Sequence, residues 1–375
     1  MEYEVPVEKG MINRGNWYRI KKCMKKAMKG ERLVTAFLGG SITQGSLASS
    51  DTTCYAYLVY EWWVSKFPKS KFTFVNAGIG ATDSQYGAAR VEEHALSAHP
   101  DFMMVEFAVN DENTAFYRET YEGVVRKVYG DRTEPALLLM NNICYDTGVS
   151  AADQHIQVAQ AYELPMVSMK TTIFPEVDSD RIPRREITPD DLHPNDAGHR
   201  LVADVIIHFL EMVYADLANE EESALFAGKR LPNPITENAF EDSRIYQNYN
   251  STETAKGFAA DRSKKENIRD IFKDGWTANA ADSKIHFTVT GTEIAVQYRK
   301  STQKPTPIAQ AIVDGDEANA VTLDGNFEET WGDKLQLTTV ARHLKSGKHD
   351  VEIRIVEKHE DDVVPFYLVS VIASR

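Results

Sequence analysis

The fold is decided by the stretch Ala36-Phe37-Leu38-Gly39-Gly40-Ser41-Ile42-Thr43. The apolar run Leu33–Leu38 ends abruptly in two glycines and a serine, as a buried parallel strand does where it enters its loop. Paired glycines permit a sharp turn and leave room beside the serine for another molecule. Because ligands of open α/β sheets bind beyond the carboxyl ends of strands, Ser41 stands where a nucleophile would be useful. The alternative is that Ser41 only caps a helix after a glycine turn.

Around this stretch, short apolar segments alternate with helical patterns. We expect strands over residues 33–38, 72–76, 102–107, 136–140 and 166–168, and helices over residues 16–30, 54–67, 84–96, 114–129 and 151–161. A last helix follows His193, with an apolar stripe through Leu201, Val205 and Phe209 and with Asn195 or Asp196 as its N-cap. This alternation predicts βαβ units and an α/β fold with a parallel sheet.

A second domain is expected because 375 residues are too many for one ordinary core. Residues 219–238 are first charged and then proline-containing, which is typical of a linker. Beyond them the apolar period becomes two, as in Val351-Ile353-Ile355, and Asp-Gly pairs punctuate the strands. We read residues 239–375 as an antiparallel β-sandwich and expect two domains, 1–225 and 226–375.

Composition excludes several partners. The net charge of -14 and the lack of a basic stripe argue against nucleic acid, since the one basic run, Arg19 to Lys29, reads as a solvated helix face. No apolar run approaches the ~18 residues of a membrane span, so no membrane partner is expected. The start Met-Glu-Tyr-Glu-Val-Pro lacks the pattern of a signal peptide, and Cys23, Cys54 and Cys144 lack paired spacing. These features predict reduced thiols and a cytoplasmic location.

The first three predicted strands end in Gly40-Ser41, Ala77-Gly78 and Val109-Asn110, and a later loop supplies Asp190 and His193. Neighbouring parallel strands bring their ends together, so these residues can share one crevice. Acyl transfer by a serine needs three such groups: a hydroxyl, a base that takes its proton, and a carboxylate that orients the imidazole. It also needs donors for the oxyanion, which here would be the Ser41 and Gly78 amides and the Asn110 side chain.

The blocks Gly40-Ser41, Gly78, Asn110-Asp111 and Asp190-x-x-His193 resemble the SGNH/GDSL hydrolases in order and spacing, over about residues 30–212. The resemblance implies a flavodoxin-like three-layer α/β/α domain. It also implies Ser41 as nucleophile, His193 as base, Asp190 as its partner, and Gly78 and Asn110 as oxyanion donors. Two departures, Gly40 where the family often has aspartate and Ala108 where it often has glycine, weaken a generic lipase assignment.

The Gly-Gly-Ser-Ile-Thr form and the β-domain are more similar to carbohydrate acetylesterases, above all carbohydrate esterase family 17, which acts on acetylated mannan oligosaccharides. In that group the β-domain is similar to a family 35 carbohydrate-binding module. The resemblance implies a serine O-acetylesterase for oligosaccharides, with an acetyl-enzyme intermediate and no metal or organic cofactor. A homo-oligomer is a further expectation. Substrate contacts are expected from Gly40, Asp111, Trp331 and Trp276, although a tryptophan of a sandwich is more often in its core.

Other interpretations stay open at this point. Asp191 competes with Asp190 as the acid of the triad, and Asp190, His193 and His199 could instead bind a metal, although the histidine spacing is unusual for zinc. A phosphate loop is excluded because Ser46 stands where its lysine should be. The functional rivals are a thioesterase or lysophospholipase acting on other esters, and an inactive carbohydrate-binding protein.

Overall fold

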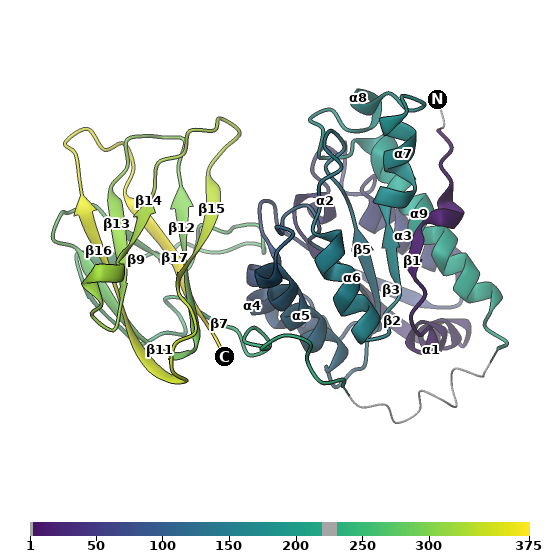
Figure 1. Cartoon of the computed structure of the whole chain (residues 1–375), viewed down its shortest axis with the longest axis horizontal. Coiled ribbons are helices and arrows are strands. Elements are labelled where there is room, and N and C mark those ends of the chain that lie inside the picture. The colour runs from purple at the N-terminus through teal and green to yellow at the C-terminus, as the bar shows by residue number, and fades with distance from the viewer. Residues whose placement is uncertain (1–2, 220–230) are drawn as a thin grey trace. The chain divides into compact units, whose positions relative to one another are not determined.

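The structure, a computed structural model, describes residues 3–219 and 231–375. The chain divides into two compact units, residues 1–238 and 239–375, each with its own sheets (Figure 1). The expected domain boundary at 225/226 lies outside the described residues.

The first unit contains one six-stranded sheet. Its strands are β1 (Met11–Asn13), β2 (Arg32–Gly39), β3 (Lys71–Gly78), β4 (Phe102–Glu106), β5 (Ala136–Asn141) and β6 (Met166–Ser168), in the order β1-β6-β5-β4-β2-β3. The strands β2 to β6 are parallel, and only β1 runs antiparallel, on β6. This order is flavodoxin-like, with the topological switch between β2 and β4, where ligands bind beyond the strand ends.

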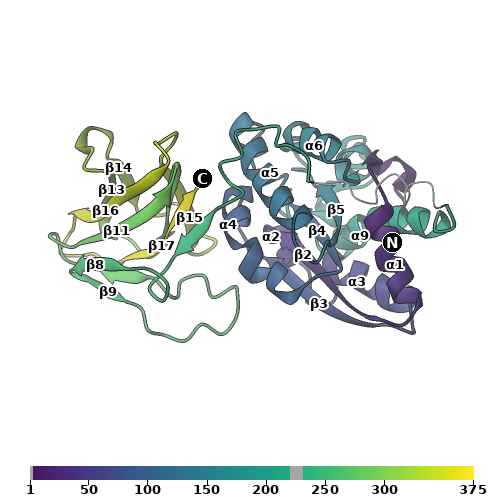
Figure 2. The same cartoon turned by 90° about the horizontal axis from the view of Figure 1, so that it is seen from below.

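Helices cover both faces of this sheet, as Figures 1 and 2 show. One face carries α1 (Tyr18–Met28), α3 (Tyr55–Lys66) and α9 (Asp196–Ala215), and the other carries α4 (Ser84–His94), α5 (Ala115–Tyr129) and α6 (Ala152–Ala161). Short helices complete the unit: α2 (Ser41–Gln44), α7 (Ile173–Asp178), α8 (Arg184–Ile187) and the 3-10 turns η1 (Val7–Lys9), η2 (Leu96–Ala98) and η3 (Met169–Thr171). The three-layer architecture expected from the sequence is confirmed.

The central strands are apolar because both of their faces are buried. Phe37 of β2 and Leu138 of β5 are fully buried, and Trp63 of α3 packs on Phe102 with ring centroids 5.1 Å apart. Helix α9 begins where the sequence predicted, since the Asn195 side chain accepts from the Gly198 amide at 3.1 Å. That cap fixes the chain just after His193.

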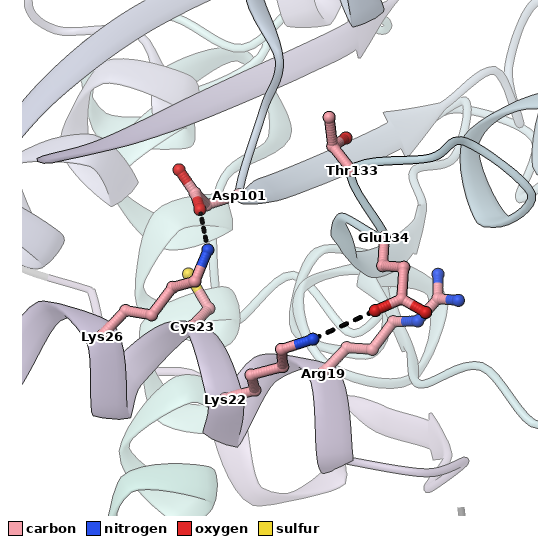
Figure 3. Close-up of a pocket in the computed structure, with 7 residues that line it drawn as sticks. All are labelled: Arg19, Lys22, Cys23, Lys26, Asp101, Thr133 and Glu134. Atoms are coloured by element: carbon pink, nitrogen blue, oxygen red, sulfur yellow. Dashed lines mark hydrogen bonds and ion pairs between the residues drawn. The ribbon is translucent and has the colours of Figure 1, made fainter. Parts of the chain in front are cut away.

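The basic run between residues 19 and 29 forms most of α1, and three of its lysines pair with carboxylates. Its Lys26 pairs with Asp101 at 2.7 Å and its Lys22 with Glu134 at 3.0 Å, in a small polar pocket (Figure 3). Lys21, only 4% exposed, pairs with Asp216 at 2.7 Å. Asp101 precedes β4, so this pocket lies at the amino ends of the parallel strands, the edge opposite to Ser41.

The second unit is the expected sandwich of antiparallel strands. One sheet has the order β15-β12-β17-β10-β9, with β7 beside β17, and the other has the order β14-β13-β16-β11-β8. The strands are β7 (Arg244–Tyr246), β8 (Glu253–Lys256), β9 (Phe258–Ala260), β10 (Trp276–Ala278), β11 (Lys284–Gly291), β12 (Glu293–Lys300), β13 (Ile308–Val313), β14 (Val321–Asp324), β15 (Lys334–Ala341), β16 (Gly347–Glu357) and β17 (Phe366–Ser374); the turn η4 (Glu317–Asn319) precedes β14. Alternate residues such as Ile285, Phe287 and Val289 fill its core.

Within residues 3–219 and 231–375, no helix has both the length and the hydrophobicity needed to cross a bilayer. Cys23, Cys54 and Cys144 are free thiols.

Candidate active site

Ser41 is the first residue of α2 and lies two residues beyond the end of β2. Its side chain is nearly buried, at 7% exposure. The Asn110 side chain packs directly on Gly40, since a Cβ added to Gly40 would lie 2.2 Å from Asn110 Oδ1. Only a glycine at position 40 lets the Asn110 side chain come this close to the backbone, which explains why the second residue of Gly39-Gly40 is glycine. The segments after β2 and β4 therefore meet at the switch point of the sheet.

His193 joins this edge from the loop before α9. Its Nε2 lies 2.7 Å from Ser41 Oγ, and its Nδ1 lies 2.6 Å from Asp190 Oδ2. The three side chains, separated by up to 152 positions in the chain, form a continuous line of hydrogen bonds. This geometry permits proton transfer from the hydroxyl to the imidazole while the carboxylate holds the opposite nitrogen.

Asp190 also organises the loop that carries the imidazole. Its Oδ1 accepts from the His193 amide at 2.7 Å and from the Leu192 amide at 3.1 Å. Burial raises the pKa of the Asp190 carboxyl, but the hydrogen bonds from the His193 side chain and from these amides outweigh burial and lower it overall. Asp190 is therefore a carboxylate at neutral pH.

Asp191, the competing acid, faces two arginines of α8. Its carboxylate pairs with Arg184 and Arg185, each at 2.7 Å, and its backbone adopts a positive φ of 72°. Because its oxygens are engaged there, Asp190 is the carboxylate that reaches the imidazole.

Two expected oxyanion donors are placed suitably. The Ser41 amide, as the first of a helix, has no acceptor within that helix. The Asn110 side chain makes no hydrogen bond to another described residue, and its buried Oδ1 has no partner there. An amide held by packing on Gly40 keeps its hydrogen-bonding capacity for a ligand.

The structure contradicts the expectation that the Gly78 amide is an oxyanion donor. Its amide donates to Asn76 Oδ1 at 2.9 Å, and a Cβ on Gly78 would lie 2.2 Å from the Gln44 amide nitrogen, so the residue is packed beneath α2. The following turn comes nearer to the nucleophile. A Cβ built on Gly80 would lie 3.8 Å from Ser41 Cβ, and the Gly80 amide donates to Gln44 Oε1 at 2.7 Å. Ala81, next in the chain, has a positive φ of 54°.

Asp111, expected to contact substrate, is buried and bonded internally. One of its oxygens accepts from the Ser84 amide at 2.8 Å, and the other lies 2.9 Å from His155 Nε2. Burial raises the pKa of Asp111 and lowers the pKa of His155. The His155 ring stacks on Tyr121 with centroids 3.6 Å apart. Asp111 therefore anchors the turn that carries Asn110, which contradicts its expected contact with substrate.

His199, a ligand in the metal alternative, is fully buried in α9. Its Nδ1 accepts from the Tyr55 amide at 3.2 Å, and its Nε2 lies 3.4 Å from Ser46 O. Both nitrogens are thus directed at backbone groups, and burial lowers the pKa of His199 to about 4. Among the described residues, no group of three or more side chains is arranged to hold a metal ion.

The two tryptophans expected to contact substrate differ in their surroundings. Trp276 is 1% exposed and packs edge-on against Phe287 in the core of the sandwich, which contradicts a contact with sugar. Trp331 is 61% exposed and stands on Phe327 with ring centroids 5.2 Å apart. Its indole is available for stacking.

Comparisons with known proteins identify the family of the chain. Residues 37–201 match the GDSL-like Lipase/Acylhydrolase family. The crystal structure of a two-domain esterase active on acetylated mannans, co-crystallised with mannopentaose, is 52% identical over 99% of this chain and 98% of that chain, with a TM-score of 0.95. A second structure of such an esterase is 52% identical over 99% of both chains, with a TM-score of 0.96.

A more distant similarity is found to Axe2, an acetylxylan esterase from Geobacillus stearothermophilus. It is 20% identical over 48% of this chain and 94% of that chain, with a TM-score of 0.39, which is too low to add to the argument. No curated protein matches the chain.

Proposed function

Because the chain belongs to the GDSL/SGNH acylhydrolase family, we propose that it is a serine esterase that removes O-acetyl groups from acetylated manno-oligosaccharides. The observation that carries the proposal is the line of contacts from Ser41 Oγ to His193 Nε2, at 2.7 Å, and from His193 Nδ1 to Asp190, at 2.6 Å. These distances suit a nucleophile, a general base and an orienting carboxylate.

In the first half of the reaction, Ser41 Oγ attacks the acetyl carbonyl carbon while its proton moves to His193 Nε2. The carbonyl oxygen becomes an oxyanion. His193 then gives the proton to the sugar oxygen as the carbon–oxygen bond to the sugar breaks, leaving a free hydroxyl and an acetyl group on Ser41. Asp190 keeps Nδ1 protonated and stabilises the imidazolium that forms between these steps.

In the second half, water attacks the acetyl carbon and gives a proton to His193. Acetic acid, which ionises to acetate, leaves when the bond to Ser41 Oγ breaks and the serine recovers its proton from His193. We assign the oxyanion contacts to the Ser41 amide and the Asn110 side chain. The third donor would be the Ala81 amide rather than that of Gly78, because the Gly78 and Gly80 amides already donate to Asn76 and Gln44.

The substrate class is inferred from the relatives that cover the whole chain. They are described as active on acetylated mannans, and one was crystallised with mannopentaose. Trp331 of the second unit, with its exposed indole, would stack on a sugar ring. A contact of Gly40 with substrate, a cytoplasmic location and a homo-oligomeric state stay predictions.

The test is mass spectrometry of acetylated manno-, xylo- and chito-oligosaccharides before and after incubation with the protein. We expect successive loss of acetyl groups, fastest for the manno-oligosaccharides. A panel of nitrophenyl esters of increasing chain length addresses the rival functions. A strong preference for long acyl chains would favour a lysophospholipase or thioesterase, and hydrolysis of no ester would favour an inactive binding protein.

A further inference from the structure

Arg90 of α4 is a fully buried arginine that no sequence motif singled out. Its Nη2 donates to Gly39 O at 2.8 Å, and its Nη1 donates to Ala77 O at 2.6 Å. Gly39 is the last residue of β2, and Ala77 is the second-last of β3. One guanidinium therefore holds the carboxyl ends of the two adjacent strands that lead to the nucleophile and to the turn beside it.

Among the residues that the structure describes, this guanidinium has no carboxylate partner. Within residues 3–219 and 231–375 no acidic oxygen lies at ion-pair distance from Arg90, and its Nε has no acceptor. The Tyr86 ring lies 5.4 Å away, and Asp83 acts only at longer range. Burial lowers the pKa of Arg90 to about 10, so the group remains charged at neutral pH. Burying a charge that only peptide dipoles stabilise costs folding free energy. We therefore expect Arg90 to have a function that offsets this cost.

Both contacts of Arg90 lead to α2. Gly39 is two residues before Ser41, and Gly39 O also accepts from the Ile79 amide at 3.1 Å, which joins it to the turn after β3. The second route passes through the Ala77–Gly78 peptide. The Gly78 amide donates to Asn76 Oδ1 at 2.9 Å, and Asn76 Nδ2 donates to Thr43 O of α2 at 2.9 Å. Hydrogen bonds in such a chain polarise one another and fix the groups they join.

We propose that Arg90 is a positioning residue of the esterase reaction. Acting through the Gly39 and Ala77 carbonyls, it fixes α2 and the turn at residues 79–81 so that the Ser41 and Ala81 amides face the oxyanion, and it adds positive potential behind them. The inference rests on the proposed function, since it assigns Arg90 a part in stabilising the charge that the Ser41 reaction creates. Arg90 itself touches neither substrate nor the reacting atoms.

The test compares wild type with Arg90→Met and Arg90→Lys on an aryl acetate. Methionine removes the charge and both donors, whereas lysine keeps the charge but cannot span two carbonyls with a rigid fork. Arg90→Met should lower kcat roughly 10- to 100-fold, less than the ~10²–10³-fold loss of a direct oxyanion donor, with KM changed by less than about 3-fold. Arg90→Lys should fall between Arg90→Met and wild type.

A second readout separates this role from a merely structural one. Phenylboronic acid forms a charged tetrahedral adduct with an active-site serine, so its inhibition constant reports on oxyanion stabilisation. It should weaken for Arg90→Met in proportion to kcat. The matched control is Arg126→Met, since Arg126 is another buried arginine, 8% exposed, that donates to a carbonyl, Pro232 O, at 2.7 Å. Its kcat and boronic acid affinity should stay within about 3-fold of wild type.

A folded Arg90→Met with wild-type kcat, or with lowered kcat but unchanged boronic acid affinity, would overturn the proposal. If Arg90→Met does not fold, Arg90→Lys decides, because wild-type kcat in that variant would show that the two-carbonyl clamp is dispensable. Failure of the proposed function is distinguishable, since wild type and Ser41→Ala would then release acetate equally slowly.

Discussion

Asp190 holds His193 at two points: its Oδ1 accepts the His193 amide at 2.7 Å, and its Oδ2 lies 2.6 Å from the Nδ1 of the same residue. The three-residue offset lets the loop fold back so that one carboxylate sets both the backbone and the ring. Ring orientation and tautomer are thus fixed together, although the Asp190 side chain is 46% exposed.

Asp190→Asn keeps the shape of this contact but removes its charge. We expect kcat to fall roughly 10²- to 10⁴-fold, because the imidazolium loses its carboxylate and the wrong tautomer is favoured. Measuring kcat on an aryl acetate checks this. The matched control is Asp191→Asn, which disturbs only the pairs with Arg184 and Arg185 and should keep kcat within about 3-fold. The reverse ranking of the two variants would move the acid of the triad to Asp191.

Asn110→Ala tests the side-chain donor of the oxyanion site. We expect a loss of about 10²–10³-fold in kcat with little change in KM, because the interaction strengthens as the oxyanion forms. Asn113→Ala is the control, since this nearby exposed asparagine only donates to Asp153, at 3.1 Å. An unchanged rate for Asn110→Ala would remove the residue from the site.

Trp331→Ala tests the proposed sugar contact. The affinity for a manno-oligosaccharide should fall roughly 3- to 10-fold through loss of stacking worth about 0.5–1.5 kcal/mol, measured by calorimetry on the Ser41→Ala background. Hydrolysis of a small aryl acetate by Trp331→Ala should match wild type, because that substrate carries no sugar. Tyr249→Ala, which removes another exposed aromatic of the same unit, 55% exposed, serves as control. Unaltered oligosaccharide affinity in Trp331→Ala would refute the contact.

His199 makes stability depend on pH. Its pKa is about 4 in the folded chain, because of burial, against 6.5 when unperturbed. Between these two pH values the unfolded chain binds more protons than the folded chain, so lowering the pH lowers the free energy of unfolding. The decrease is complete only below pH 4.

His199→Gln removes this titration. Wild type should therefore lose roughly 2–3 kcal/mol of unfolding free energy relative to His199→Gln as the pH falls from about 7 to about 4.5. Urea unfolding of both proteins at the two pH values measures the difference. A difference independent of pH would show that His199 is not held neutral by burial.

Much of the first unit is predictable because the spacing of apolar residues clearly distinguishes its strands from its helices. Helix α3 and strand β6 lie within one residue of their expected bounds, and Asn195, one of the two expected N-caps, caps α9. Strand β1 was missed because three residues at a sheet edge leave no pattern. In the second unit, strands as short as β8 and β9 leave no clear pattern for the same reason.

The sequence predicts which residue types take part in the site. It does not predict the direction in which each side chain or backbone amide points. Ser41, His193 and Asp190 meet as expected, because strand ends and one capped loop bring them to a shared edge. The errors concern direction. Asp111 points into the protein although it adjoins Asn110, and the Gly78 amide is taken by a side chain two residues earlier. Such local hydrogen bonds leave no signal in a single sequence.

The most direct test of the central claim is intact-protein mass spectrometry after rapid acid quench of the protein mixed with an acetyl ester. We expect a transient gain of one acetyl group, located on Ser41 by peptide mapping and absent in Ser41→Ala. Continuous release of acetate by Ser41→Ala at the wild-type rate, or an acetyl group carried on another residue, would contradict it.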